Sequence, residues 1–222
     1  MILGFSLDQL LALVTTLVVI IDPLGNAPVF AGLTAGGDDR YRRRMAIKAH
    51  VIAAGVLTLF AVSGNALLSF LGIGLPAFRT AGGLMLLMIA LEMVFEKRSQ
   101  RKSRAAEKQL SALGREEPNE MPHDIAVFPV AIPLLAGPGS VATVLLLASG
   151  GIGQSSEGLA LLIGVILIIL LLSCVVFILV GKATRWLNDS ILSVVTRLLG
   201  ILLAALAMQY ILDGLKASLF SG

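Results

Sequence analysis

The sequence is poor in charge, cysteine and histidine, and each shortage argues against a class of protein. Only 14% of its 222 residues are charged, whereas a soluble domain carries roughly a quarter. This low charge argues against a soluble globular domain, a disordered chain or a nucleic-acid-binding tail. The single cysteine, Cys174, excludes a disulfide framework within the chain. The two histidines, His50 and His123, are too few for a three-histidine zinc site and no HExxH motif occurs, so no metal is expected.

What the sequence has instead is long apolar runs. Hydrophobic residues make up 57% of the chain and the mean hydropathy is +0.93. A helix needs about 20 apolar residues to cross the hydrocarbon core, and six runs meet this length: 5–33, 49–71, 75–95, 125–148, 158–180 and 191–212. The first run lacks the basic flank of a signal peptide, so we expect it to remain as a span. The pattern predicts an all-α polytopic membrane protein.

Basic residues are concentrated in alternate loops. Most of the 17 lysines and arginines lie within 40–48, 97–115 and 182–185, whereas 72–74 and 149–157 contain none. The positive-inside rule then predicts a cell (inner) membrane protein with both termini outside the cytoplasm. Because the arginines at 40–44 directly follow a span, we interpret them as contacts to anionic membrane lipid rather than to nucleic acid.

Two short motifs recur in corresponding spans. Residues 23–28 read PLGNAP and residues 133–138 read PLLAGP; residues 79–82 read RTAG and residues 197–200 read RLLG. Each half of the chain has three spans, so the second half must enter the membrane from the opposite side. Inverted repeats of this kind are a recurrent transporter design.

The motifs divide the chain into three parts. Residues 1–96 form the first three-helix repeat, 97–123 a cytoplasmic loop and 124–222 the second repeat. The paired prolines and glycines predict that helices 1 and 4 are discontinuous, since proline removes a backbone donor and obstructs the preceding turn. The alternative is two simple proline kinks with glycines for close packing.

Candidate binding residues follow from these expected breaks, where freed N–H groups suit a carboxylate and unwound carbonyls suit a cation. They are Asp22, Pro23, Gly25, Asn26, Gly137, Pro138, Gly139, Ser140 and Thr143. Two alternatives stay open. Asp22 either serves the site, as the nearest candidate for proton or cation coupling, or caps the second half-helix. The hydroxyls of Ser140 and Thr143 either face the break or bond back to their helix.

Two arginines occupy corresponding positions in the two halves. Arg79 and Arg197 each begin a span, at opposite membrane faces. They are candidates for gating or ion pairing. The alternative is that each extends to the nearest interface, as lone arginines do.

In these motifs the sequence resembles the MarC family of integral membrane proteins. The resemblance rests on DPLGNAP at 22–28, FRTAGG at 78–83 and PLLAGPG at 133–139, and continues through 197–200 to Gln209 and the Asp213–Gly214 pair. It covers nearly the whole chain. It implies similarity to proteins described as transporters of small neutral amino acids, with binding residues around Asn26 and Gly137–Ser140. It implies no cofactor.

The expected function is therefore secondary transport of a small solute, most simply glycine or alanine, with a proton or sodium as the coupling ion. The other expected partner is membrane lipid, and a homo-oligomer is compatible with the sequence. The alternative is a non-transporting membrane scaffold or stress-related protein of the same family. An enzyme is not expected, because Ser140 has no histidine placed to activate it and Asp22 has no acidic partner. No GxxxxGK[ST] loop is present, so ATP does not drive transport from within this chain.

Overall fold

The computed structural model describes residues 6–34, 37–95, 125–150, 153–183 and 189–220, and every regular element in these ranges is a helix. The elements in chain order are α1 (Leu7–Ile21), α2 (Pro23–Leu33), α3 (Asp39–Phe70), α4 (Leu75–Val94), η1 (Ala126–Leu135), α6 (Pro138–Ser149), α7 (Ser156–Ala183) and α8 (Asp189–Phe220). The predicted cytoplasmic loop at 97–123 lies outside the described residues.

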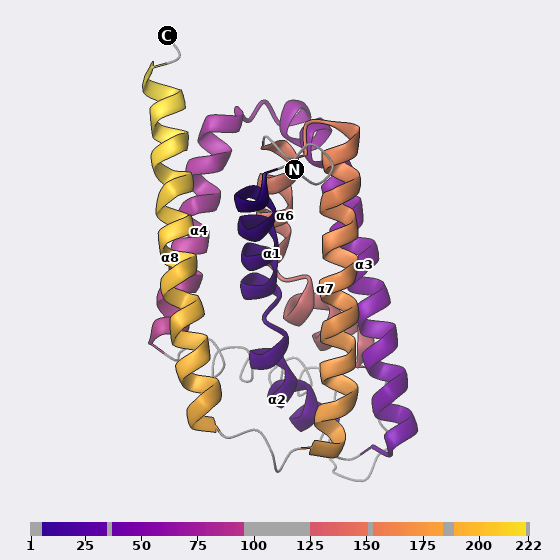
Figure 1. Cartoon of the computed structure of the whole chain (residues 1–222). Helices are drawn as coiled ribbons and strands as arrows, with labels where there is room; N and C mark the ends of the chain where they lie inside the picture. The colour runs from indigo at the N-terminus through magenta and orange to yellow at the C-terminus, as the bar shows by residue number, and fades with distance from the viewer. Residues whose placement is uncertain (1–5, 35–36, 96–124, 151–152, 184–188, 221–222) are drawn as a thin grey trace.

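The helices are long and apolar enough for a membrane protein. Five stretches could each cross a bilayer: Leu7–Leu33, Asp39–Gly64, Leu75–Val94, Ser156–Leu179 and Val194–Leu219. Ala126–Leu135 and Pro138–Ser149, bent by 55° at their junction, make a sixth if they are counted as one span. The all-helical polytopic prediction is therefore confirmed for the described residues. The start of α1 and the end of α8 lie at the same end of the bundle (Figure 1), as an even number of crossings requires.

The bundle has two flanking helix pairs and a central group. Helices α4 and α8 lie side by side on one flank, α3 and α7 on the other, with α1, α2 and α6 between them (Figure 1). Small residues let α4 and α8 approach closely. A Cβ on Gly83 would lie 2.8 Å from the Ala207 carbonyl oxygen, and one on Gly214 would lie 2.8 Å from that of Pro76. Any larger residue at either position would push the pair apart.

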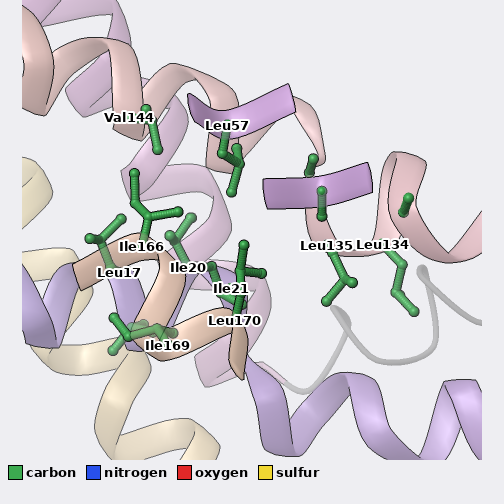
Figure 2. Close-up of a cluster of buried hydrophobic side chains, with 14 of the residues drawn as sticks. Leu17, Ile20, Ile21, Leu57, Leu134, Leu135, Val144, Ile166, Ile169 and Leu170 are labelled. Atoms are coloured by element: carbon green, nitrogen blue, oxygen red, sulfur yellow. The ribbon is translucent and has the colours of Figure 1, made fainter. Parts of the chain in front are cut away.

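A cluster of buried hydrophobic side chains surrounds the central helices. Leu17, Ile20 and Ile21 of α1 meet Val144 of α6 and branched side chains from α3, η1 and α7 (Figure 2). Ile21 and Leu135 are both fully buried, and each is the last residue of its helix. The core thus fixes the point at which the first helical segment of each central span ends.

Candidate functional site

The first break in the helices is a single residue, Asp22. It ends α1 and begins α2 in the left-handed conformation, with φ 54° and ψ 62°. A non-glycine residue tolerates this conformation best when its short polar side chain bonds locally. Asp22 does so, because its Oδ1 accepts the N–H of Gly25 at 3.0 Å. The structure therefore shows Asp22 capping α2, and its role in a binding site stays a prediction.

Gly25 is needed for this cap. A Cβ at position 25 would lie 2.5 Å from Oδ2 and 2.6 Å from Oδ1 of Asp22. These distances are shorter than real Cβ contacts, so any side chain would displace the carboxylate. Asp22 and Gly25 are both buried, and together they close the N-terminus of α2 against the interior.

The first unwound segment is shorter than the sequence predicts. The two prolines at 23 and 28 were expected to frame non-helical backbone, but both lie within α2. Pro23 occupies the first turn, where its missing N–H costs nothing. Pro28 is an exposed residue inside the helix. The expectation is wrong for this segment, because one left-handed residue suffices to separate the two helices.

The second break lies between η1 and α6, at Ala136 and Gly137. Before it, η1 is not a regular helix, because Phe128 (φ −124°, ψ 128°) and Ile132 (φ −127°, ψ 122°) have extended backbone. The N–H of Val130 bonds the Ile125 carbonyl, and that of Ala136 bonds the Ala131 carbonyl, each five residues back. After it, Pro138 opens α6 with Gly137 as the N-cap residue and no side-chain cap. Pro129, a further proline inside η1, is a signal that the sequence reasoning missed.

The two breaks meet inside the bundle through Asn26. Its Nδ2 donates to the Ile21 carbonyl at 2.6 Å and lies 3.4 Å from the Leu134 carbonyl oxygen. Leu134 is 108 residues away along the chain. Asn26 is fully buried, so this contact holds the first break directly against η1. Asn26 and the second break, which were predicted to share a site, are brought together.

The hydroxyl groups of the second break are used within the protein. Ser140 Oγ donates to the Leu135 carbonyl at 2.9 Å, across the break. Thr143 Oγ1 donates to the Gly139 carbonyl at 2.7 Å, within its own helix. A Cβ on Gly139 would collide with Ile89 of α4, so α6 begins in close contact with that helix. The back-bonding alternative holds for Thr143, whereas Ser140 ties the two half-helices together.

The two arginines lie on the α4–α8 pair, Arg79 in α4 and Arg197 in α8. Arg79 Nη2 lies 3.7 Å from where a Gly150 Cβ would be, beside the C-terminal end of α6. A cation is favourable at a helix C-terminus. Arg197 is exposed on α8, one turn before Gly200, which packs on Met93 of α4. They stand at different levels of the α4–α8 pair.

One buried polar pair was not predicted from the sequence. His50 Nε2 and Ser173 Oγ lie 2.9 Å apart and join α3 to α7. The signal was a histidine inside an apolar run and a serine inside the most apolar one. Among the described residues, no group of three or more His, Cys, Asp or Glu side chains could hold a metal ion.

Comparison with known proteins identifies the family. The family model described as "MarC family integral membrane protein" matches residues 7–219. The chain belongs to the MarC family. This confirms the resemblance inferred from the motifs, and the match spans both halves of this MarC chain.

Curated relatives carry the name "UPF0056 membrane protein". One from Aquifex aeolicus is 38% identical over 201 residues, covering 90% of this chain and 89% of the relative. One from Bacillus subtilis, named YvbG, is 33% identical and covers 90% of this chain and 91% of the relative. One from Archaeoglobus fulgidus is 32% identical and covers 93% of this chain and 92% of the relative. No solved structure matches the chain.

Proposed function

We propose that this MarC protein is a secondary transporter of a small neutral amino acid such as glycine or alanine. The observation that carries the proposal is the contact between two helix breaks from opposite halves of the chain, made by Asn26 with the Leu134 carbonyl. Interrupted helices facing each other at a repeat interface are the usual substrate site of secondary transporters. The proposal includes inverted three-helix repeats, a location in the inner membrane and both termini outside the cytoplasm.

The breaks share a pattern that supports the repeat. In each, a polar side chain donates to the last carbonyl of the first half-helix from five residues further on: Asn26 to Ile21, and Ser140 to Leu135. In each, a proline then opens the second half-helix: Pro23 in α2 and Pro138 in α6. As the residue that opens the second half-helix, Pro23 corresponds to Pro138, whereas the sequence motifs paired it with Pro133.

The electrostatics of the two breaks differ in a way that suits a zwitterion. The N-terminus of α2 is already occupied by the Asp22 carboxylate. In α6 the first intrahelical bond is donated by Val141, and no side chain caps the N–H groups of Gly139 and Ser140 before it. A substrate carboxylate is therefore favoured at α6, where the helix dipole is positive. The ammonium group is favoured near Asp22 and the carbonyl end of α1.

The size of the substrate follows from the packing. Gly139 is pressed against Ile89, with Ile20 of α1 also within contact distance of its Cβ position. Both isoleucines come from the helices that border the start of α6. A long substrate side chain would have to displace them, which favours glycine or alanine over larger amino acids.

The test is exchange of labelled alanine by purified protein in liposomes. Asn26→Leu should lower exchange about tenfold or more, which corresponds to losing roughly 1.4 kcal/mol of polar interaction. The matched control is Thr16→Val, which removes a buried hydroxyl that bonds only within α1 and should leave exchange near the wild-type rate. Equal loss in both variants would indicate a packing effect. Wild-type protein that exchanges no small amino acid would refute the proposal and favour the scaffold alternative.

A further inference from the structure

The pair formed by His50 and Ser173 lies inside the bundle and joins α3 to α7. His50 is 5% exposed and Ser173 is fully buried. His50 lies eleven residues, or about 16 Å of helix, from the start of α3. Burying an imidazole and a hydroxyl at this depth is costly unless both are hydrogen-bonded. Both are, and the bonds define the state of the ring.

The hydrogen bonds fix the tautomer of His50. Its Nδ1 lies 2.8 Å from the Ala46 carbonyl oxygen. A carbonyl only accepts, so Nδ1 carries a hydrogen and donates it. In the neutral ring Nε2 is then the bare nitrogen, and it accepts the Ser173 hydroxyl hydrogen at 2.9 Å. The ring thus presents a basic lone pair to a hydroxyl that can turn.

Few other ionisable groups surround this nitrogen. On α7, the Cys174 thiol follows Ser173 and is buried. Helices η1 and α6, which also pack on α3, contain no ionisable side chain. On α3 itself, Arg43, Arg44 and Lys48 are exposed. The aromatic neighbour is Phe177, whose ring meets that of His50 edge to face at 4.9 Å.

We propose that His50 is the proton-binding site that couples transport to a proton gradient, with Ser173 as the hydrogen-bond partner of its Nε2; this inference rests on the proposed function. Among the described buried residues, the carboxylic acid is Asp22, and its side chain is committed to capping α2. His50 is the buried group that can take a proton without losing its anchor, because the Nδ1–H bond to Ala46 is kept.

The proton step needs only one local rearrangement. An incoming proton bonds to the Nε2 lone pair, and the ring becomes an imidazolium. The new Nε2–H then donates to Ser173 Oγ, which accepts through an oxygen lone pair. The serine hydrogen that formerly pointed at Nε2 turns to a carbonyl one turn back in α7, as helical serines commonly do. Release of the proton reverses each change.

A route from this pair to the first break passes through stacked rings. Phe177 of α7 stacks on Phe30 of α2, with ring centroids 4.7 Å apart and 27° between the planes. Both rings are buried, with at most 1% exposed. Helix α2 is the half-helix that Asp22 caps, and α7 also packs on α1. A change in the α3–α7 bond is therefore transmitted to the half-helix on one side of the substrate site.

The test measures alanine exchange and proton movement in the same liposomes, with a pH-sensitive dye inside. In wild type, an outward alanine gradient should move protons, and exchange should depend on pH. His50→Gln keeps a polar side chain, but a glutamine amide does not take up a proton. It should retain alanine exchange within about threefold, lose the alanine-driven proton flux and show a flat pH profile, whereas wild type changes by up to about tenfold per pH unit.

Two further variants separate coupling from packing. His123→Gln makes the same change at the other histidine and should leave both flux and pH profile unchanged. Ser173→Ala keeps the imidazole and should retain proton flux with a displaced pH profile. Proton flux that persists in His50→Gln would overturn the inference, and so would wild-type protein that exchanges alanine without moving protons. The latter result leaves the proposed function intact, whereas no alanine exchange in wild type refutes both.

Discussion

Replacing Gly25 with alanine should destabilise the protein, against the usual rule for helices. Alanine normally stabilises a helix by about 1 kcal/mol relative to glycine. At position 25, however, the new methyl group would lie 2.5–2.8 Å from three atoms of the Asp22 carboxyl group. The carboxylate must move, and its 3.0 Å bond to the Gly25 N–H is then lost. Loss of a buried bond to a charged group costs roughly 1.5–3 kcal/mol.

Gly32 provides a matched control in the same helix. A Cβ at position 32 would have no heavy atom within 4 Å, so Gly32→Ala should show only the helix-propensity gain. The difference between the two variants then isolates the cap, at roughly 1.5–3 kcal/mol. For a chain of this length that corresponds to about 3–12 °C in Tm.

The assay can use the chain's own cysteine. Cys174 is the single cysteine and is buried, so a thiol-reactive dye in detergent reports unfolding as the temperature rises. Gly25→Ala should unfold at a clearly lower temperature than Gly32→Ala. Equal Tm values for the two alanine variants would mean that the Asp22 cap does not hold α2 in place.

Three further predictions follow from the packing and the charge pattern. In a thermal melt, the free energy of unfolding of Asp22→Asn should stay within about 0.5 kcal/mol of wild type, because asparagine keeps the cap and tolerates the left-handed backbone. Asp22→Ala should lose about 1–2 kcal/mol of stability. Similar losses in both variants would refute the capping role. Gly83→Ala should lower the free energy of unfolding by about 1–3 kcal/mol, because the new methyl group forces α4 away from α8. Gly164→Ala is the control, since a Cβ there would have open space around it and should not destabilise the protein. Equal melting temperatures for the two variants would contradict the close packing of α4 and α8. With Cys174 replaced by alanine, a cysteine at Gln154 should react with an impermeant thiol reagent in intact cells. A cysteine at Arg43 should react only after permeabilisation. The reverse pattern of labelling would overturn the proposed orientation with both termini outside the cytoplasm.

Much of the fold could be predicted from the sequence because the bilayer imposes a simple length rule. The long apolar runs and the discontinuity of both proline-containing spans were foreseen, since a proline inside a helix removes a hydrogen bond wherever it occurs. The exact position of each break was not. In segment 23–28, Pro28 stays inside α2, and the helix is interrupted only at Asp22, which adopts the left-handed conformation. That choice depends on whether the Asp22 carboxylate can reach Gly25, which the proline pattern does not reveal.

The candidate site shows the same division. Asn26 could be singled out as a polar residue beside a break, but its contact with Leu134 depends on how the two halves dock. For Thr143, the bond to the Gly139 carbonyl within α6 decided between two alternatives that the sequence left open. The His50–Ser173 bond could not be foreseen, because it joins residues 123 positions apart on helices whose relative rotation is set by packing.

The most direct test of the helix breaks as the substrate site is a structure of the protein determined with L-alanine bound. We expect ligand density between the two breaks, with the carboxylate within hydrogen-bond distance of the Gly139 and Ser140 N–H groups and the ammonium group on the side of Asp22 and Ile21. Density elsewhere in the bundle, in protein that still exchanges alanine, would contradict the assignment of the helix breaks as the substrate site.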